Sequence, residues 1–162
     1  MKIERATADA VREVALHMRD RDFVEFSAVS PAGSREELAG VLARSYGGRD
    51  DVMCVYDGKA PVAIAGTIEA WPNVITLLFF ATPDFPNVAL PVTRFFRRLF
   101  NQYEAAGVHR IQAISIDDYA QTHQWLRLFG LKPETGPMLN YGRNGEAFIQ
   151  FSRVRDVRPT GA

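Results

Sequence analysis

The sequence has little of what disulfide scaffolds, zinc sites and membrane spans are made from. Cys54 is the one cysteine in 162 residues, so no intrachain disulfide can form and a secreted disulfide framework is disfavoured. The histidines His17, His109 and His123 are scattered, and no His-x-x-x-His or Cys-x-x-Cys pair occurs, so we expect no metal site. No apolar run approaches the roughly 20 residues that cross a bilayer, so we expect no membrane partner.

An excess of charge of one sign is missing as well. Lys and Arg number 19, and Asp and Glu also number 19, which gives a formal net charge of zero. Arg94, Arg97 and Arg98 lie close together, and arginine binds phosphate well. The balancing acids favour solvated or ion-paired arginines, and we expect no nucleic-acid partner. No signal peptide opens the chain, which favours a cytoplasmic protein.

The chain does have enough apolar material for a core. Hydrophobic residues make up 47% of it, which at this length is typical of one globular domain. Cys54 lies in the apolar run 52–56, which favours a small buried side chain over a catalytic thiol. We expect one domain over residues 1–154, and the aperiodic residues 155–162 predict a flexible tail.

The stretch 110–133 predicts the unit around which the chain is organised. An isoleucine-rich run over 111–116 has the length of a buried strand. Asp117 and Asp118 follow, and either could cap the next helix. Apolar residues then recur at helical spacing until Gly130, which predicts a strand, a capped helix and a glycine stop. His123 lies on this helix, and we expect it to face solvent.

The remaining elements follow from periodicity and turn residues. The sequence Asp57-Gly58 predicts a tight turn between two strands. The predicted order is strand, two helices, three strands, helix, strand, helix and two strands, which indicates an α+β fold with a mixed sheet flanked by helices. The expected ranges are strand 2–6, a helix from 7 or 9 to about 26, helix 34–47, strands 52–56, 61–71 and 74–81, helix 88–106, strand 111–116, helix 119–129, and strands 138–141 and 147–154.

Two short strings resemble known acyltransferases. Trp125-Leu126-Arg127-Leu128-Phe129-Gly130-Leu131 is similar to the last helix of the GNAT acyltransferase superfamily. The later string Tyr141-Gly142-Arg143-Asn144-Gly145-Glu146-Ala147-Phe148 resembles GNAT-like proteins of tailed phages, among them the internal virion protein A family. The resemblance covers about residues 1–154. It implies the GNAT fold, with a mostly antiparallel mixed sheet flanked by helices, and a phage-encoded protein.

The resemblance also implies where acetyl-CoA would bind. In GNAT proteins the cofactor arm enters a wedge between two splayed parallel strands, here 74–81 and 111–116, and the pyrophosphate meets the next helix N-terminus. Tyr119 and Trp125 could contact cofactor, although packing in the core is the simpler role for each. The implied cofactor-binding residues are Phe80, Ala81, Thr82, Asn87, Val88, Tyr119 and Trp125.

Two departures from the GNAT pattern stand out. The glycine-rich phosphate loop should fall between Thr82 and Pro91, but this segment has no glycine. Asp84 would repel phosphate there, and Pro86 removes a backbone donor. Where many relatives place a tyrosine that protonates the leaving thiolate, this chain has Leu126, which cannot transfer a proton.

A base for the acceptor amine is expected on a strand that faces the wedge. By resemblance, Glu69 is the best-placed carboxylate, with solvated surface as its alternative role. Asp117 is the second candidate, with helix capping as its alternative. Two functions therefore stay open: an acyl-CoA-dependent N-acyltransferase with an unidentified amine acceptor, or a non-catalytic GNAT fold that serves a phage as a virion or host-interaction protein.

Overall fold

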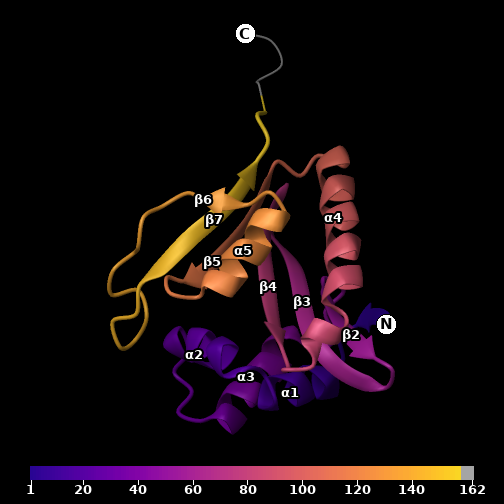
Figure 1. The fold of residues 1–162 in the computed structure, drawn as a ribbon, viewed down its shortest axis with the longest axis vertical. Helices are drawn as coiled ribbons and strands as arrows, with labels where there is room; N and C mark the ends of the chain where they lie inside the picture. The colour runs from indigo at the N-terminus through magenta and orange to yellow at the C-terminus, as the bar shows by residue number, and fades with distance from the viewer. Residues whose placement is uncertain (158–162) are drawn as a thin grey trace.

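The computed structural model describes residues 1–157, and it contains one seven-stranded sheet with helices on both sides (Figure 1). The strand order is β1-β2-β3-β4-β5-β7-β6, and neighbours are antiparallel except for the parallel pair β4 and β5. This confirms the predicted α+β class. The strands are β1 Lys2–Arg5, β2 Val52–Asp57, β3 Ala60–Trp71, β4 Val74–Ala81, β5 Arg110–Ile116, β6 Lys132–Pro133 and β7 Phe148–Val154.

The helices divide the protein into two cores, one on each face of the sheet. One core lies between the sheet and helices α4 and α5, and the other lies between the opposite face and helices α1 and α3. In Figure 1 the first three helices gather beneath one end of the sheet. The helices are α1 Ala8–Leu16, α2 Asp20–Ala28, α3 Arg35–Tyr46, α4 Ala89–Ala105 and α5 Ala120–Leu128, with a short 3₁₀ turn, η1, at Phe85–Asn87.

The long first helix of the sequence analysis is two helices in the structure. It breaks at His17–Arg19, where the backbone N–H of Arg19 donates to the carbonyl of Ala81 at 2.8 Å instead of continuing the helix. The break turns α2 toward the end of β4. Helix α2 therefore lies beside the ends of β4 and β5, a position that a single straight helix could not reach.

The last third of the chain also differs from prediction in two places. The expected strand over 138–141 is only an isolated bridge between Met138 and Phe148, while the edge strand β6 forms at Lys132–Pro133. Neither predicted aspartate caps α5, because its N-cap residue is Tyr119, without a side-chain capping bond. The predicted stop at Gly130 is confirmed, with φ of 81° and its N–H bonded to Arg127.

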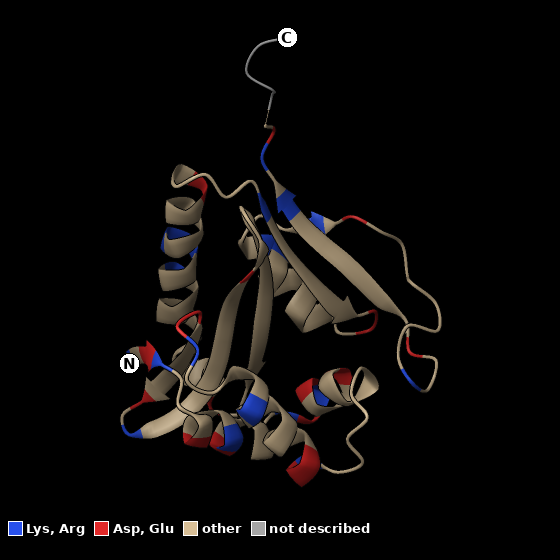
Figure 2. Ribbon diagram, turned by 180° about the vertical axis from the view of Figure 1, so that it is seen from behind, with Lys and Arg blue, Asp and Glu red and all other residues tan. Residues whose placement is uncertain are grey.

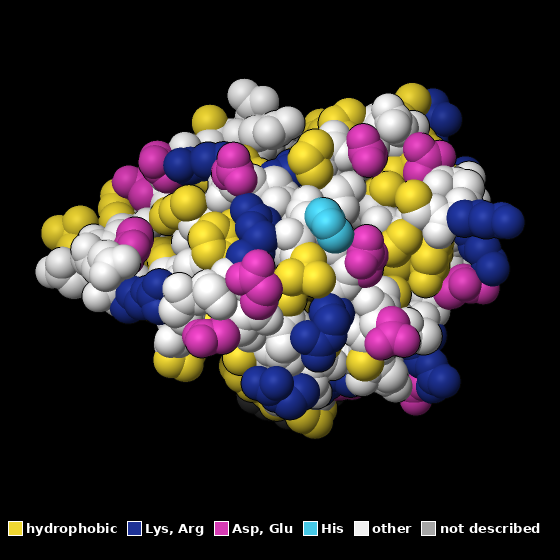
Figure 3. Space-filling view, turned by 90° about the horizontal axis from the view of Figure 1, so that it is seen from below, with side chains coloured by type: hydrophobic (Ala, Val, Ile, Leu, Met, Phe, Trp, Pro, Cys, Tyr) yellow, Lys and Arg dark blue, Asp and Glu magenta, His cyan; other side chains and the backbone are white. Residues whose placement is uncertain are grey.

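Charged side chains are distributed over the surface with both signs mixed. Figure 2 shows Lys and Arg beside Asp and Glu on the helices that gather beneath one end of the sheet. Seen from below, where α1 to α3 lie, the same surface carries basic, acidic and apolar side chains side by side (Figure 3). Over residues 1–157, no helix combines the length and hydropathy needed to cross a membrane. Of the predicted tail, residues 158–162 lie outside the described part of the chain.

Candidate active site

Strands β4 and β5 pair at one end only. Their parallel register runs from Val74 opposite Arg110 to Thr76 opposite Gln112 and then stops. Beyond that point β4 stays paired with β3, and β5 stays paired with β7. The two strands therefore diverge toward α2, as Figure 1 shows. The sheet contains a V-shaped gap that no other strand fills.

Backbone groups line both arms of this gap. The N–H of Ala81 on β4 and the N–H of Ile116 on β5 both donate to side chains of α2, so both point into the gap. Backbone direction alternates along a strand, so Phe79 and Ile114 turn their N–H and C=O groups the same way. An extended ligand placed between the strands would meet these groups as a third strand would.

Helix α2 closes the wide end of the gap with two carboxylates. Asp22 accepts the N–H of Ala81 at 2.9 Å, and Glu25 accepts the N–H of Ile116, also at 2.9 Å. The two acids are three residues apart and therefore share one face of the helix. Each replaces a missing strand partner, so α2 holds the arms of the gap apart.

Asp22 is the centre of a buried polar network. Its side chain is almost fully buried, and it accepts from Arg19 Nε at 2.9 Å and Nη2 at 3.1 Å. The hydroxyl of Tyr119 donates to the same carboxylate at 3.0 Å. Burial, reinforced by the Asp22 charge, raises the pKa of Tyr119 to about 12. Tyr119, predicted to contact cofactor, is instead bound to α2 within the protein.

Glu25 differs from Asp22 because no cation of residues 1–157 forms an ion pair with it. Burial raises the pKa of Glu25 to about 7, although the hydrogen bonds from Ile116 N–H and the Ser115 hydroxyl lower it. Ser115 donates to the same oxygen at 3.1 Å. A carboxyl group with this pKa exchanges its proton near neutrality, as a general base requires. Glu25 also lines the cleft between the diverging strands.

The cleft continues from the gap in two directions. Its centre is lined by side chains of β4, β5 and α5, among them Leu77, Ala113 and Trp125. One extension, about 560 Å³, runs between the N-terminus of α4 and helix α5. The other, about 200 Å³, runs beneath the C-terminal half of α2. Glu25 and Phe79 line both the centre and the second extension, so these two parts of the cleft join beside Glu25.

Aromatic rings form the wall between the centre and the larger extension. The ring centroids of Phe79 and Trp125 are 4.5 Å apart, and those of Phe79 and Phe85 are 5.1 Å apart. Trp125 Nε1 donates to the Thr93 hydroxyl at 2.9 Å, which fixes the indole between α5 and α4. The structure thus places Trp125 on the cleft wall and also in the packing between helices.

The predicted pyrophosphate site offers few donors. The N–H groups of Asn87 and Val88 already donate to the carbonyls of Asp84 and Phe85 at 3.1 and 3.0 Å. In the first turn of α4, Pro91 has no N–H, which leaves the N–H groups of the two residues before it. Arg19 is the cation that lines this extension. The N-terminus of α4 thus offers few free backbone N–H groups to a phosphate.

The strand-end contacts predicted for cofactor are also occupied. Phe80 is fully buried, and its register opposite Ile64 turns its backbone toward β3. Ala81 is bonded to Asp22 and Arg19, and the N–H of Thr82 donates to the carbonyl of Val62 at 2.9 Å. The backbone groups available to a ligand lie nearer the narrow end, at Leu77, Phe79 and Ile114.

The two predicted bases do not lie in the cleft lining. Glu69 is exposed at the β3–β4 hairpin, where it accepts the N–H of Asn73 at 3.0 Å. Its strand partner is Ile75, within the paired end of β4 and β5. Asp117 is exposed just after β5, with its N–H bonded to Ala147. Both therefore lie outside the cleft lining, in which Asp22 and Glu25 are the described carboxylates.

His123 was expected to face solvent, and this was wrong. It is 8% exposed, its Nε2 lies 2.9 Å from the carbonyl of Ile116, and its ring centroid lies 4.9 Å from that of Phe151. The imidazole on α5 thus contacts the backbone carbonyl of Ile116 at the end of β5, and Glu25 on α2 accepts the N–H of the same residue. Within residues 1–157, no group of three or more His, Cys, Asp or Glu side chains could hold a metal ion.

Comparison with solved structures identifies the architecture. The ribosomal-protein-S18-alanine N-acetyltransferase of Escherichia coli superposes with a TM-score of 0.69 at 16% identity, covering 99% of this chain and 97% of that one. The chain has the GNAT acetyltransferase fold. A putative acetyltransferase from Salmonella typhimurium, solved with its cofactor acetyl-CoA, matches with a TM-score of 0.64 at 16% identity, covering 100% of this chain and 98% of that one.

A third GNAT structure supports the same architecture. The ribosomal-protein-alanine N-acetyltransferase of Brucella melitensis matches with a TM-score of 0.66 at 14% identity, covering 96% of this chain and all of that one. No protein-family model matches the sequence. No curated protein matches it either. The narrower resemblance to phage proteins stays a prediction, because these neighbours are bacterial acetyltransferases.

Proposed function

We propose that the protein is an N-acyltransferase that transfers an acyl group from an acyl-CoA thioester to a primary amine. The observation that carries the proposal is the gap between β4 and β5, which opens after the pair Thr76–Gln112 and leads into a cleft on both sides. Solved proteins of the same fold are acetyltransferases, and one of them contains acetyl-CoA. The sequence identities are too low to carry the activity by themselves.

The residues of the gap fit the extended arm of an acyl-CoA. Phe79 and Ile114 would hydrogen-bond the arm through their backbones, while Trp125 and Phe85 would pack against it. Arg19 and the first turn of α4 would face the phosphates. Bound there, the donor supplies an acyl group activated as a thioester.

Glu25 is the base in this proposal. Its carboxylate takes a proton from the acceptor ammonium and passes it to solvent, which leaves a neutral amine. The amine nitrogen then bonds to the acyl carbon as the carbon–sulfur bond breaks. A second proton leaves that nitrogen, and the sulfur gains one. The products are an amide, a free thiol and one released proton, so atoms and charges balance.

No tyrosine lines the centre of the cleft in the part of the chain that the structure describes. The hydroxyl of Tyr119 is bonded to Asp22, and Leu126 has no proton to give. We therefore assign protonation of the leaving sulfur to the proton released by the amine. The thiol product needs no dedicated acid in this scheme.

The test is binding and turnover with acetyl-CoA. We expect millimolar acetyl-CoA to raise the melting temperature by a few degrees, since a ligand at 100 times its Kd adds about 2.7 kcal/mol. We also expect release of free thiol when a mixture of amines is added. An unchanged melting temperature at millimolar acetyl-CoA would contradict the proposal.

A non-catalytic protein of the same fold is the second candidate. The loss of backbone donors at Asn87 and Val88 and the proline in the first turn of α4 favour it, since they weaken the phosphate end. It predicts no thiol release with any amine, whether or not acetyl-CoA binds. A phage virion or host-protein role would be a further proposal within this candidate.

A further inference from the structure

The extension of the cleft beneath α2 has an unusually uniform lining. Apolar side chains from α2, β4, β5 and the segment before β7 surround it, and the lining residues include Phe26, Val29, Leu77, Ile114, Tyr141 and Phe148. Glu25, Thr76 and the hydroxyl of Tyr141 are the polar side-chain groups of the lining. The Thr76 hydroxyl already accepts from Gln112 Nε2 at 3.1 Å, and Glu25 is the acidic side chain that faces a ligand.

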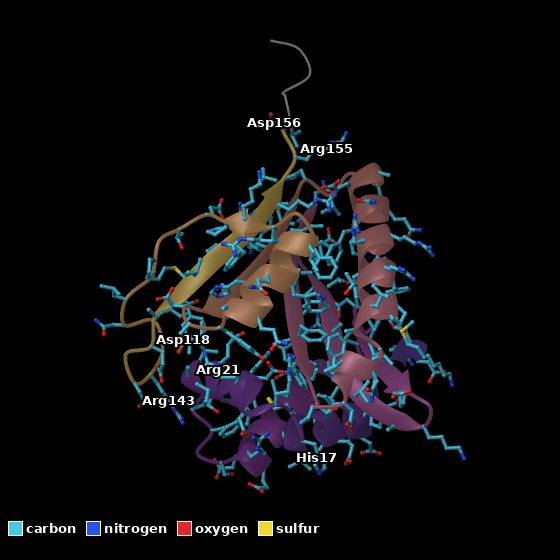
Figure 4. The ribbon with its side chains drawn as sticks, in the orientation of Figure 1. His17, Arg21, Asp118, Arg143, Arg155 and Asp156 are labelled. Atoms are coloured by element: carbon cyan, nitrogen blue, oxygen red, sulfur yellow. The ribbon has the colours of Figure 1, made fainter. Side chains whose placement is uncertain are left out.

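The far wall of this pocket is part of the folded structure. Arg143 donates from its backbone N–H to the Ala28 carbonyl at 2.8 Å. Its Nη1 donates to the carbonyls of Ser30 and Ala32 at 3.1 and 2.8 Å. Figure 4 shows Arg143 between the segment before β7 and the C-terminal end of α2. These hydrogen bonds hold the segment before β7 against the end of α2. In this segment the ring centroid of Tyr141 lies 5.1 Å from that of Phe148.

The rim of the pocket leaves apolar surface in water. Val29 is 56% exposed, Tyr141 45% and Ile114 40%. Covering such surface stabilises a complex in proportion to the apolar area removed from water. An apolar ligand body would therefore gain free energy here, whereas a polar body would lose its hydration without new partners.

Charge selects the rest of the ligand. Among the described residues of the lining, Glu25 is the carboxyl group, so it can pair with one ammonium group. A second ammonium would be placed against Phe26 or Phe148 with no counter-charge, and a ligand carboxylate would meet Glu25 with no cation beside it. Beyond the open backbone edges of β4 and β5, the apolar side chains of the lining offer no partner to a peptide amide, and a buried amide left unpaired disfavours binding.

Resting on the proposed acyltransferase function, we propose that the acceptor is a small primary amine on an alkyl or aryl body that carries no second charge. The amine would lie against Glu25 and beside the gap, and the body would lie between Val29 and Tyr141. A pocket of about 200 Å³ suits a body of about the size of one aromatic side chain. Diamines, amino acids and peptide N-termini are excluded as preferred acceptors.

A panel of acceptors with acetyl-CoA tests the proposal. We expect kcat/KM for 2-phenylethylamine to exceed that for 1,4-diaminobutane, β-alanine and an alanyl peptide by at least about tenfold, which corresponds to about 1.4 kcal/mol. If the diamine, the amino acid or the peptide is the best acceptor, the inference is wrong while the acyltransferase function stands. If no amine releases thiol, the proposed function itself fails, and the inference fails with it.

A pair of matched variants tests the same pocket. Val29→Glu adds a carboxylate to the rim, and Val24→Glu adds one to an exposed position on the same helix outside the lining. We expect Val29→Glu to shift the kcat/KM ratio of 1,4-diaminobutane to 2-phenylethylamine toward the diamine by about tenfold, since each tenfold equals about 1.4 kcal/mol. We expect Val24→Glu to leave the ratio unchanged.

The variants give a clear reading in either direction. Equal ratios for Val29→Glu and Val24→Glu would show that the acceptor body does not lie at Val29, and the inference would be overturned. Both positions are exposed, so a folding defect is not expected from either change. Melting temperatures of the two variants serve as the control for folding.

Discussion

At the scale of single residues, the account depends on Glu25. It lies on α2 among apolar neighbours, accepts two hydrogen bonds from β5, and faces the cleft where donor and acceptor would meet. Asp22 on the same helix face is paired with Arg19, whereas Glu25 has no cationic partner in the part of the chain that the structure describes. This difference separates a structural carboxylate from one that can exchange a proton.

Replacing this carboxylate should remove most of the activity. We expect Glu25→Gln to lower kcat/KM for amine acylation by about 10²- to 10⁴-fold, the usual contribution of a general base. The measurement is thiol release at saturating acetyl-CoA over a series of subsaturating amine concentrations. Glu69→Gln is the matched control, because Glu69 lies at the β3–β4 hairpin, and we expect it to keep activity within about twofold. Equal losses in the two variants would contradict the assignment.

The same group should make stability depend on pH. The pKa of Glu25 is raised from 4.5 to about 7 in the folded protein, so the folded state holds its proton more tightly than the unfolded state does. Its contribution to the free energy of unfolding is therefore full below about pH 4.5 and is lost as pH rises through about 7. Glu25→Gln cannot lose a proton. We expect its melting temperature to gain on the wild type between pH 5 and pH 8, and a constant difference would count against the raised pKa.

At the scale of elements, α2 acts as a wedge between two strands. Its two carboxylates bind the ends of β4 and β5, and the pair between Arg21 and Asp118 joins the same helix to the turn after β5. In Figure 4 Arg21 and Asp118 point toward one another. Side chains of α2 therefore hold the ends of both strands that border the gap.

Removing the buried carboxylate of Asp22 should destabilise the fold. We expect Asp22→Ala to lower the free energy of unfolding by about 3–5 kcal/mol, because it leaves the Arg19 guanidinium without its buried partner. Asp20→Ala, on the same helix, removes an exposed side chain and should cost about 1 kcal/mol or less. Urea unfolding of both variants measures the difference. Similar losses in the two would show that the network around Asp22 does not support the wide end of the sheet.

The sequence predicted elements well where one pattern decided them. Asp57-Gly58 predicted a turn that the structure confirms, with φ of 59° at the glycine, and Gly130 predicted the end of α5. The break near His17 was missed, because the apolar pattern continues through it and a contact with Ala81, far along the chain, causes it. The strand expected over 138–141 was predicted as one of a final pair around Gly142 to Gly145, but in the structure this segment pairs through one isolated bridge, between Met138 and Phe148.

The candidate base was missed for a related reason. In the sequence Glu25 is one acid on an amphipathic helix, and such an acid is ordinarily solvated. Its burial comes from Ser115 and Ile116, about ninety residues later. The available indication was that Asp22 and Glu25 directly precede Phe23 and Phe26, which places two acids beside apolar residues on a short helix. His123 was misplaced in the same way, because its partner is a backbone carbonyl of another element.

At the scale of the whole molecule, one cleft passes through the sheet and connects two extensions whose linings differ in charge and polarity. The side that we assign to the donor has Arg19 and the N-terminus of α4, and the side that we assign to the acceptor is apolar apart from Glu25, Thr76 and the Tyr141 hydroxyl. The sheet supplies the passage between them because β4 and β5 separate after Thr76. The order of strands, shared with acetyltransferases of known structure, sets this geometry.

The most direct test of this account uses the tryptophan on the cleft wall. The chain has two tryptophans, and Trp71 is exposed at the hairpin, so Trp71→Phe leaves Trp125 as the sole indole. We predict that acetyl-CoA changes the fluorescence of this variant along a saturable curve, with the same Kd that thermal stabilisation gives. A flat titration to millimolar acetyl-CoA would contradict the claim that the gap between β4 and β5 receives the donor.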